Sequence, residues 1–223
     1  MLPAKLSASL MCANLLDIEK DIRELEQAGI EYLHMDIMDG EFVPNLMLNN
    51  LFLKAVRSIT KLPFDIHLMI TNPERKLDWF DIRPGDIVSI HYESTSNVLG
   101  SLQLIEEKGA LPSVALSPAT SIESIHYVLD NIKMVNIMAV NPGFAGRKMV
   151  PMTLQKIQDT RNMLDSLGYG HIMLEVDGNV SLENASHMRH AGADVFVGGS
   201  SGLFLSDKSI QVSAKKLKDV INC

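Results

Sequence analysis

Apolar runs and amphipathic segments alternate along the whole chain. Runs that are rich in Val, Ile, Leu and Met predict strands, and apolar residues spaced three or four apart predict helices. Strands are predicted in a run after residue 5, at 32–40, 63–69, 86–91, 111–116, 134–140 and 171–178, and in a run that ends at residue 197. Helices are predicted at 15–25, 51–59, 99–108 and 154–167, from residue 73, from residue 121 and toward residue 221.

This order of elements determines the expected fold class. Strands that alternate with helices pair in parallel through right-handed crossovers. Eight such units in 223 residues favour an α/β fold, a single-domain (β/α)8 TIM barrel, over a doubly wound sheet, whose dinucleotide-binding fingerprint is missing from this sequence. No linker-like stretch interrupts the alternation, so we expect one domain over residues 1–223.

Charge and composition exclude some classes of function. A net charge of −7 without any basic run argues against a nucleic-acid partner. No apolar run approaches the ~20 residues of a bilayer span, which argues against a membrane partner. The faint likeness of residues 5–16 to a signal peptide is interrupted by polar residues, so we predict a buried strand there. Two cysteines without a paired motif fit a reducing, cytoplasmic location.

Metal-competent side chains occur where three predicted strands end. His34 and Asp36 are two residues apart and therefore face the same side of their strand, His67 lies near the end of the next strand, and Asp177 ends a later one. If these ends meet, they supply the mixed nitrogen and oxygen set that suits a divalent metal such as zinc, manganese, cobalt or iron. A lone strand histidine is more often a hydrogen-bonded core residue. A metal site is favoured because all four candidate ligands lie near the C-terminal ends of their predicted strands.

Two glycine-rich turns are candidates for binding phosphate. One covers residues 141–147, after the sixth strand, and the other covers 197–204, after the eighth. Glycine lets backbone N–H groups approach an anion closely, although glycines also occur simply because a turn requires them. In a (β/α)8 barrel the loops after the last strands are a recurrent phosphate site. We therefore expect both turns, with Gly178 and Asn179, to surround one phosphate group.

Several motifs together resemble the ribulose-phosphate 3-epimerase family. They lie at 9–12, 34–40, 42–45, 65–69, 141–146 and 175–178, so the resemblance covers essentially the whole chain. It implies that His34, Asp36, His67 and Asp177 bind one divalent ion per chain, for which we expect Zn²⁺, with Mn²⁺, Co²⁺, Fe²⁺ or Mg²⁺ as alternatives. It also implies that Asp36 and Asp177 are the two acid/base carboxylates.

The substrate implied by the resemblance is a ketose phosphate. Inverting the carbon beside a ketone requires a base on each face of a planar enediolate, and two carboxylates on different strands suit that task. Three methionines are expected to crowd the reacting carbon, although they also fit an ordinary core. The expected substrate-binding residues are Ser9, Met38, His67, Met69, Met138, Gly143, Phe144, Ala145, Gly146, Gly178, Asn179, Gly199 and Ser200.

The local motifs resemble one branch of the family more than the others. Residues 143–146 and 201–204 are similar to epimerases of D-allulose 6-phosphate, so the expected reaction is its conversion to D-fructose 6-phosphate. The alternatives are D-ribulose 5-phosphate to D-xylulose 5-phosphate, and a non-catalytic sugar-phosphate-binding protein. A metal-free lyase or decarboxylase with an Asp-x-Lys-x-x-Asp strand would use a lysine of that strand, and the strand here offers none. Four residues depart from the common family pattern: Glu41, Asn14, Arg147 and Asn179. Separately, we expect the protein to form a homo-oligomer.

Overall fold

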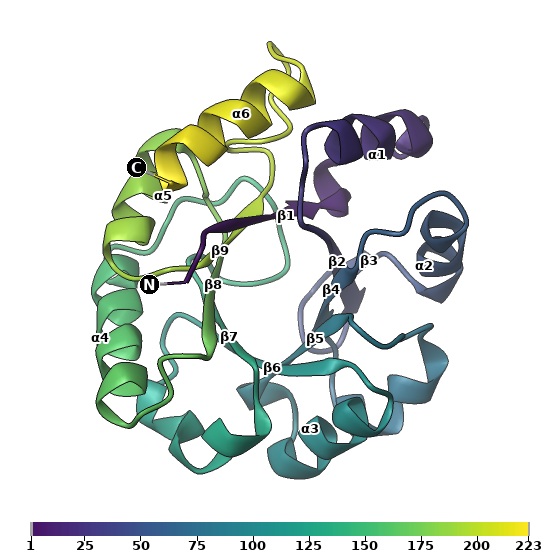
Figure 1. Cartoon of the computed structure of the whole chain (residues 1–223). Coiled ribbons are helices and arrows are strands. Elements are labelled where there is room, and N and C mark those ends of the chain that lie inside the picture. Colours follow the sequence, from purple (N-terminus) through teal and green to yellow (C-terminus); the bar gives the residue numbers. More distant parts are fainter. Residues whose placement is uncertain (1, 223) are drawn as a thin grey trace.

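The predicted strands form a closed barrel of eight parallel strands with the helices outside it (Figure 1). The computed structural model describes residues 2–222. The barrel closes because β1 pairs with both β2 and β9. The two-residue β3 (Leu46–Met47) adds to the end of β2 in antiparallel fashion. The barrel strands are β1 (Lys5–Ser9), β2 (Tyr32–Asp39), β4 (Phe64–Met69), β5 (Ile87–His91), β6 (Leu111–Leu116), β7 (Met134–Met138), β8 (Met173–Asp177) and β9 (Val195–Gly198).

Six α-helices surround the barrel in the described part of the chain. They are α1 (Ile18–Gln27), α2 (Asn50–Arg57), α3 (Val98–Glu107), α4 (Thr153–Ser166), α5 (Leu182–His190) and α6 (Ile210–Ile221). Side chains of Asn49, Asn97, Ser181 and Ser209 cap four of these helices by accepting hydrogen bonds from backbone N–H groups of the first turn. None of the helices within residues 2–222 is long and apolar enough to cross a bilayer.

Three helical segments differ from the sequence prediction. The segment from Pro73 forms two short 3-10 turns, η2 (Pro73–Arg75) and η3 (Leu77–Trp79), because hydrogen bonds span three residues, as from Lys76 N to Pro73 O. The segment after β6 is also a 3-10 helix, η5 (Ile122–Asn131). The first helix begins only at Ile18.

Leu15 and Leu16 therefore lie in a turn before α1 and not on its apolar face. The Asn14 side chain accepts a hydrogen bond from Leu16 N, and Asn14 N donates to Asp21 of the helix, which fixes this turn. Leu16 is 99% exposed. Its helical spacing in the sequence was misleading, because the side-chain hydrogen bonds of Asn14 compete with helix formation there.

The barrel strands are buried on both faces. Side chains on the outer face, such as Leu33, Met35 and Ile66, pack under the helices in the main apolar core. Side chains on the inner face form layers, of which the lowest is an apolar cluster around Ile87, Met134 and Val195. The alternation of side chains along each strand puts a polar layer above it. Its members are fully buried: Ser7, His34, Asp65, Ser89, Ser113, Asn136 and Glu175.

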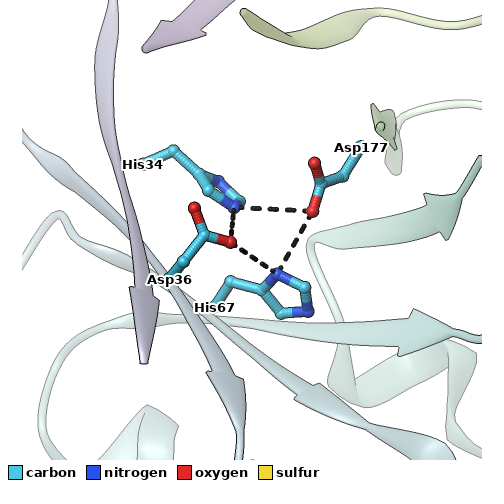
Figure 2. A group of neighbouring side chains, drawn as sticks. All are labelled: His34, Asp36, His67 and Asp177. Atoms are coloured by element: carbon cyan, nitrogen blue, oxygen red, sulfur yellow. Dashed lines mark ion pairs between the residues drawn. The ribbon is translucent and has the colours of Figure 1, made fainter. Parts of the chain in front are cut away.

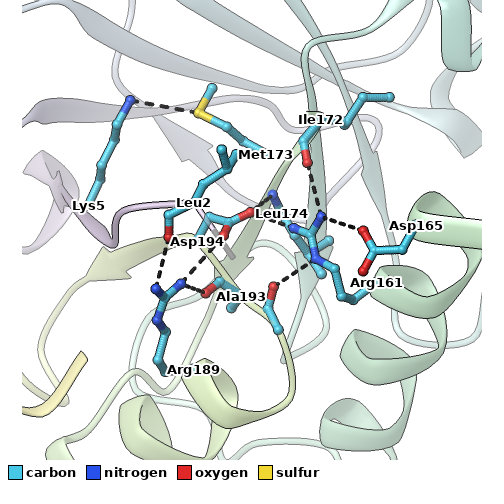
Figure 3. A network of polar contacts seen from close by, with 11 residues as sticks. Leu2, Lys5, Arg161, Asp165, Ile172, Met173, Leu174, Arg189, Ala193 and Asp194 are labelled. Atoms are coloured by element: carbon cyan, nitrogen blue, oxygen red, sulfur yellow. Dashed lines mark hydrogen bonds and ion pairs between the residues drawn. The ribbon is translucent and has the colours of Figure 1, made fainter. Parts of the chain in front are cut away.

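A buried ionic network lies at the N-terminal ends of β8 and β9, against the helices α4 and α5 (Figure 3). Asp194, just before β9, accepts hydrogen bonds from Arg161 Nη2 of α4 at 2.5 Å and from Leu174 N of β8 at 3.0 Å. Arg189 of α5 reaches Asp194 at 3.4 Å and donates to Leu2 O at 2.8 Å. The network thus joins two helices, two strands and the first described residues.

We predict that Asp194→Ala lowers the free energy of unfolding by about 3–5 kcal/mol, because it leaves buried guanidinium groups without their counter-charge. Denaturant-induced unfolding measures the change. Asp165→Ala is the control, since this carboxylate is 58% exposed and 3.7 Å from Arg161; its effect should stay within about 1 kcal/mol. Equal effects of both substitutions would contradict the importance of burial.

Candidate active site

Three strands bring the four predicted ligand residues together at the C-terminal mouth of the barrel (Figure 2). The register pairs Asp36 of β2 with His67 of β4, and Asp177 extends from the end of β8. His34 Nε2 lies 3.4 Å from Asp36 Oδ1 and 3.7 Å from Asp177 Oδ2. His67 Nδ1 lies 3.6 Å and 3.3 Å from the same two oxygens. The four side chains therefore present one ligand atom each to a common point.

The cluster fits a tetrahedral divalent ion. Ligand distances of about 2.0–2.1 Å to zinc correspond to about 3.3–3.4 Å between ligand atoms, close to the separations observed. Within the described residues, His34 Nε2 and His67 Nδ1 are buried without a hydrogen-bond partner. Buried polar atoms are rarely left unsatisfied. An ion between the four groups would satisfy both nitrogens at once.

The electrostatics of the cluster favour a cation. Burial opposes charge on both imidazoles, but Asp65 and Asp36 raise the pKa of His34, and Asp177 and Asp36 raise the pKa of His67. Burial raises the pKa of Asp36, but the two imidazoles outweigh it and the net shift is downward. The carboxylates thus attract positive charge into the cluster, as protons or as a metal ion, and binding a metal would release the protons.

A second set of polar groups lies beneath the cluster. Asp65 accepts a hydrogen bond from Ser7 Oγ at 2.7 Å and contacts His34 Nδ1 at 2.6 Å, which leaves His34 Nε2 directed at the cluster. Burial and the charge of Asp65 raise the pKa of Glu175 well above its ordinary value. Ser9 Oγ donates to Asp36 Oδ2 at 2.7 Å, which leaves Asp36 Oδ1 for the ion.

Sequence analysis assigned no role to Asp65 or Glu175. Each stands two residues before a predicted ligand on the same inner face, Asp65 before His67 and Glu175 before Asp177. That two-residue spacing was a signal for both residues. Their partners lie on other strands, however, and only the barrel register shows which groups they contact.

A cavity that opens to solvent lies above the cluster and is lined by Asp36 and Asp177. His34 and His67 are fully buried below it and do not line it. The substrate contact expected for His67 therefore stays a prediction. The other residues expected to bind substrate all line the cavity: Ser9, Met38, Met69, Met138, Gly143, Phe144, Ala145, Gly146, Gly178, Asn179, Gly199 and Ser200. Sequence analysis missed Met11, Cys12 and Val140, which line it too, and Ser201 lines it from the expected phosphate-binding turn 197–204.

The loop glycines differ in how strongly the backbone requires them. Gly178 has φ +111°, a conformation that residues with a side chain rarely adopt, and a Cβ there would lie 2.6 Å from a methyl group of Val140. Both the backbone conformation and the packing of this turn therefore require glycine. Gly199 lies outside the left-handed region, and a Cβ at this position would meet only Cys12 Sγ, at 3.3 Å, among the described residues. This contact is tight, but a small shift of the Cys12 side chain relieves it, so packing requires glycine less strictly at position 199 than at position 178. Close approach of a ligand to its backbone is a further physical reason for a residue without a side chain there.

Asn179 adopts a left-handed conformation with φ +51° and joins two of the loops at the cavity. Its side-chain nitrogen donates to Ser201 Oγ at 3.3 Å, and Asn184 Nδ2 donates to Asn179 Oδ1 at 2.7 Å. The turn after β8 is therefore held against the turn after β9. This contact sets the distance between the carboxylate of Asp177 and the last glycine-rich turn.

Asp39 joins the loops that follow β2 and β4. Its Oδ1 accepts hydrogen bonds from Glu41 N and Phe42 N, both at 3.0 Å. Its Oδ2 accepts from Thr71 N at 2.9 Å and from Lys76 Nζ at 2.8 Å. Burial raises the pKa of Asp39, but the hydrogen bonds from Lys76 and the three backbone groups outweigh it and lower the pKa to about 2.

The fold and the site define a class: a (β/α)8-barrel protein with a two-histidine, two-carboxylate centre beneath a glycine-lined cavity. The family model described as the ribulose-phosphate 3 epimerase family matches residues 5–204. The chain belongs to the ribulose-phosphate 3-epimerase family. This confirms the resemblance seen in the sequence and the expected enzyme class, a carbohydrate-phosphate 3-epimerase.

Curated relatives match most of the chain. The ribulose-phosphate 3-epimerase of Bacillus subtilis (strain 168) is 37% identical over 209 residues, covering 94% of this chain and 96% of the relative. That of Escherichia coli (strain K12) is 36% identical over 198 residues, covering 88% and 87%. The chloroplastic enzyme of Arabidopsis thaliana is 40% identical over 197 residues, covering 87% and 70%. All three relatives are named as epimerases of ribulose phosphate, and none of the three is named for D-allulose 6-phosphate.

Solved structures support the fold. The 3-keto-L-gulonate-6-phosphate decarboxylase of Vibrio cholerae superposes with a TM-score of 0.69 at 11% identity, covering 99% of this chain and 98% of that one. The 3-hexulose-6-phosphate synthase of Salmonella typhimurium gives a TM-score of 0.64 at 16% identity, covering 97% and 98%. At such identities the likeness concerns the barrel alone.

We predict that Asp39→Asn destabilises the protein in a pH-dependent way. The shift from 3.8 to about 2 corresponds to about 2 kcal/mol. Because the folded pKa is depressed, this contribution is present above pH 3.8 and is lost as the pH falls toward 2. Denaturant unfolding of wild type and variant should therefore differ by about 2 kcal/mol at pH 7 and converge at low pH. Asp78→Asn, at a 92% exposed carboxylate, is the control; a difference for Asp39→Asn that does not vary with pH would contradict the assignment.

Proposed function

We propose that this protein interconverts D-ribulose 5-phosphate and D-xylulose 5-phosphate by inverting the configuration at C3. The observation that carries the proposal is the pair Asp36 and Asp177, which line one cavity from strands separated by β1 and β9. The names of the curated relatives support the five-carbon substrate. The large share of the chain that they cover supports a common reaction.

The two carboxylates have the chemistry that epimerisation needs. The proton on C3 is acidic because C3 lies beside the ketone, and its removal gives a planar enediolate. One carboxylate removes the proton from one face, and the other returns a proton to the opposite face. The lowered pKa of Asp36 keeps it ionised and able to accept a proton. Ser9 Oγ holds Asp36 in a fixed orientation through its hydrogen bond of 2.7 Å.

The centre beneath the cavity would hold one divalent metal ion through His34, Asp36, His67 and Asp177. When bound, the ion acts as a Lewis acid that stabilises negative charge on the substrate oxygens. Its two nitrogen and two oxygen ligands suit Zn²⁺ and also admit Mn²⁺, Co²⁺ or Fe²⁺. The four ligands also distinguish this proposal from a non-catalytic sugar-phosphate-binding protein, which has no need for a complete centre.

The remaining cavity residues would hold the substrate and exclude water. Met38, Met69 and Met138 present flexible apolar side chains next to the carboxylates, and such side chains adapt to an irregular carbon skeleton. The phosphate would lie at the turns that contain Gly146, Gly178, Asn179, Gly199 and Ser200. Backbone N–H groups of such turns bind phosphate without a cluster of lysines.

We predict that Asp177→Asn lowers kcat by about 10²–10⁴-fold, because one face of the enediolate loses its acid/base group. In D₂O the wild type should place solvent deuterium at C3 of the product, which NMR detects. Circular dichroism establishes that the variant is folded, and Asp207→Asn, at a 72% exposed carboxylate beyond β9, should retain full activity. Product without solvent deuterium would contradict the two-base mechanism.

We predict that kcat/KM for D-ribulose 5-phosphate exceeds that for D-allulose 6-phosphate by at least about tenfold. The centre fixes the ketone end and the glycine-rich turns fix the phosphate, so one more carbon misplaces C3, and an error of about 1 Å can cost ~10²-fold in rate. Coupled assays on both sugars measure the ratio. Unphosphorylated D-ribulose is the control and should be a poor substrate. A preference for the six-carbon sugar would disprove the proposed substrate without affecting the two carboxylates.

A further inference from the structure

Both ring nitrogens of His67 have a defined neighbour. Nδ1 faces the two carboxylates of the centre, at 3.3 Å from Asp177 Oδ2 and 3.6 Å from Asp36 Oδ1. Nε2 points the other way and lies 2.9 Å from Nε2 of His91, the last residue of β5. The two rings stack with centroids 5.0 Å apart and planes inclined by 27°.

His91 connects this contact to a carboxylate at the rim of the barrel. It is fully buried, and its Nδ1 lies 3.1 Å from Glu93 Oε2 in η4 (Tyr92–Ser94). The other oxygen of Glu93 accepts hydrogen bonds from Ser117 N at 2.9 Å and from Thr120 Oγ1. A chain of hydrogen-bonding groups therefore leads from the centre across β5 to the loop after β6.

The far end of this chain is fixed as well. Lys156 of α4 donates from Nζ to Ser117 O and to Thr120 O, both at 2.7 Å. The loop that holds Glu93 is thus attached to a helix. Phe42 covers the His91 ring from the loop after β2, with centroids 4.7 Å apart. His91 consequently has little freedom to turn.

Only one arrangement of protons lets His67 serve as a ligand and satisfies every contact. A metal ligand needs the lone pair on His67 Nδ1, so the His67 proton is on Nε2 and is donated to His91 Nε2. His91 then carries its own proton on Nδ1 and donates it to Glu93. The carboxylate thereby sets the tautomer of both rings. For His34 a carboxylate acts directly, without a second histidine between them, because Nδ1 lies 2.6 Å from Asp65 Oδ2.

We propose that His91 and Glu93 are positioning residues that hold His67 in the tautomer and orientation required for metal binding. The inference rests on the metal centre proposed above and extends it to two residues that contact neither the ion nor the substrate. Groups that hydrogen-bond to a ligand histidine typically contribute about 10–100-fold to metal affinity. A hydrophobic residue at position 91 would pack equally well but accept no hydrogen bond.

The experiment measures metal affinity and not only activity. Full-length wild type, His91→Phe, His91→Gln and Glu93→Gln are titrated with Zn²⁺ in competition with a chelator, and Co²⁺ complexes are compared by visible absorption. We expect Kd to rise about 10–100-fold in His91→Phe and about tenfold in Glu93→Gln, with an altered Co²⁺ spectrum. His91→Gln should recover part of the affinity, because its amide oxygen can accept from His67 Nε2. Glu123→Gln, at an exposed carboxylate of η5, should match wild type.

The outcomes separate this inference from the proposed function. Unchanged Kd and spectrum in Glu93→Gln and in either folded His91 variant would overturn the positioning role. Unfolding is measured in parallel, so a general loss of stability can be told apart from a specific loss of metal affinity. Glu93→Gln is in addition a nearly isosteric change at a partly exposed group. Wild type that binds neither ion would overturn the metal centre together with this inference. Wild type that binds metal but does not epimerise D-ribulose 5-phosphate would overturn the proposed substrate alone.

Discussion

The constraint on which the structure depends is the cost of burying polar groups inside a closed barrel. Side chains that point inward from the middle of a strand have no access to bulk water, so each polar atom needs a partner within the barrel. Within this layer Ser7 Oγ donates to Asp65, and Asp65 contacts His34 Nδ1. His34 Nε2 and His67 Nδ1, at the top of this layer, are among the buried side-chain atoms that lack a hydrogen-bond partner in the described residues, and both belong to the proposed centre.

The same constraint explains how the centre keeps its geometry. Each ligand imidazole has one nitrogen at the cluster and one at a hydrogen-bonding neighbour, Asp65 for His34 and His91 for His67. The carboxylate of Asp36 divides its oxygens in the same way between the cluster and Ser9. Because these contacts lie below the cavity, they preorganise the centre before a substrate arrives, and the loops above need only hold the sugar phosphate.

The sequence predicted the strands and the convergence of the four candidate ligand residues well, because both depend on local pattern. A two-residue period shows which side chains share a face, and the end of each strand shows which of them reach the mouth. It did not predict the contacts of His91, Glu93, Asp65 or Glu175, because these join neighbouring strands through the barrel register. It also misplaced the start of the first helix, since Leu15 and Leu16 repeat a helical spacing that a turn then interrupts. The sequence also could not decide the length of the substrate, because short motifs do not measure the distance between two anchored ends.

The ionic network around Asp194 lies at the end of the barrel opposite to the cavity. The Asp194 network and the residues that line the cavity thus lie at opposite ends of one axis. Activity commonly limits how far a protein can be stabilised, because strained active-site groups are themselves destabilising. In this protein the distance between the Asp194 network and the cavity reduces that conflict. Selection for a hotter environment can act on the closed end while selection for a different sugar acts on the loops at the mouth, and each change leaves the other set of contacts in place.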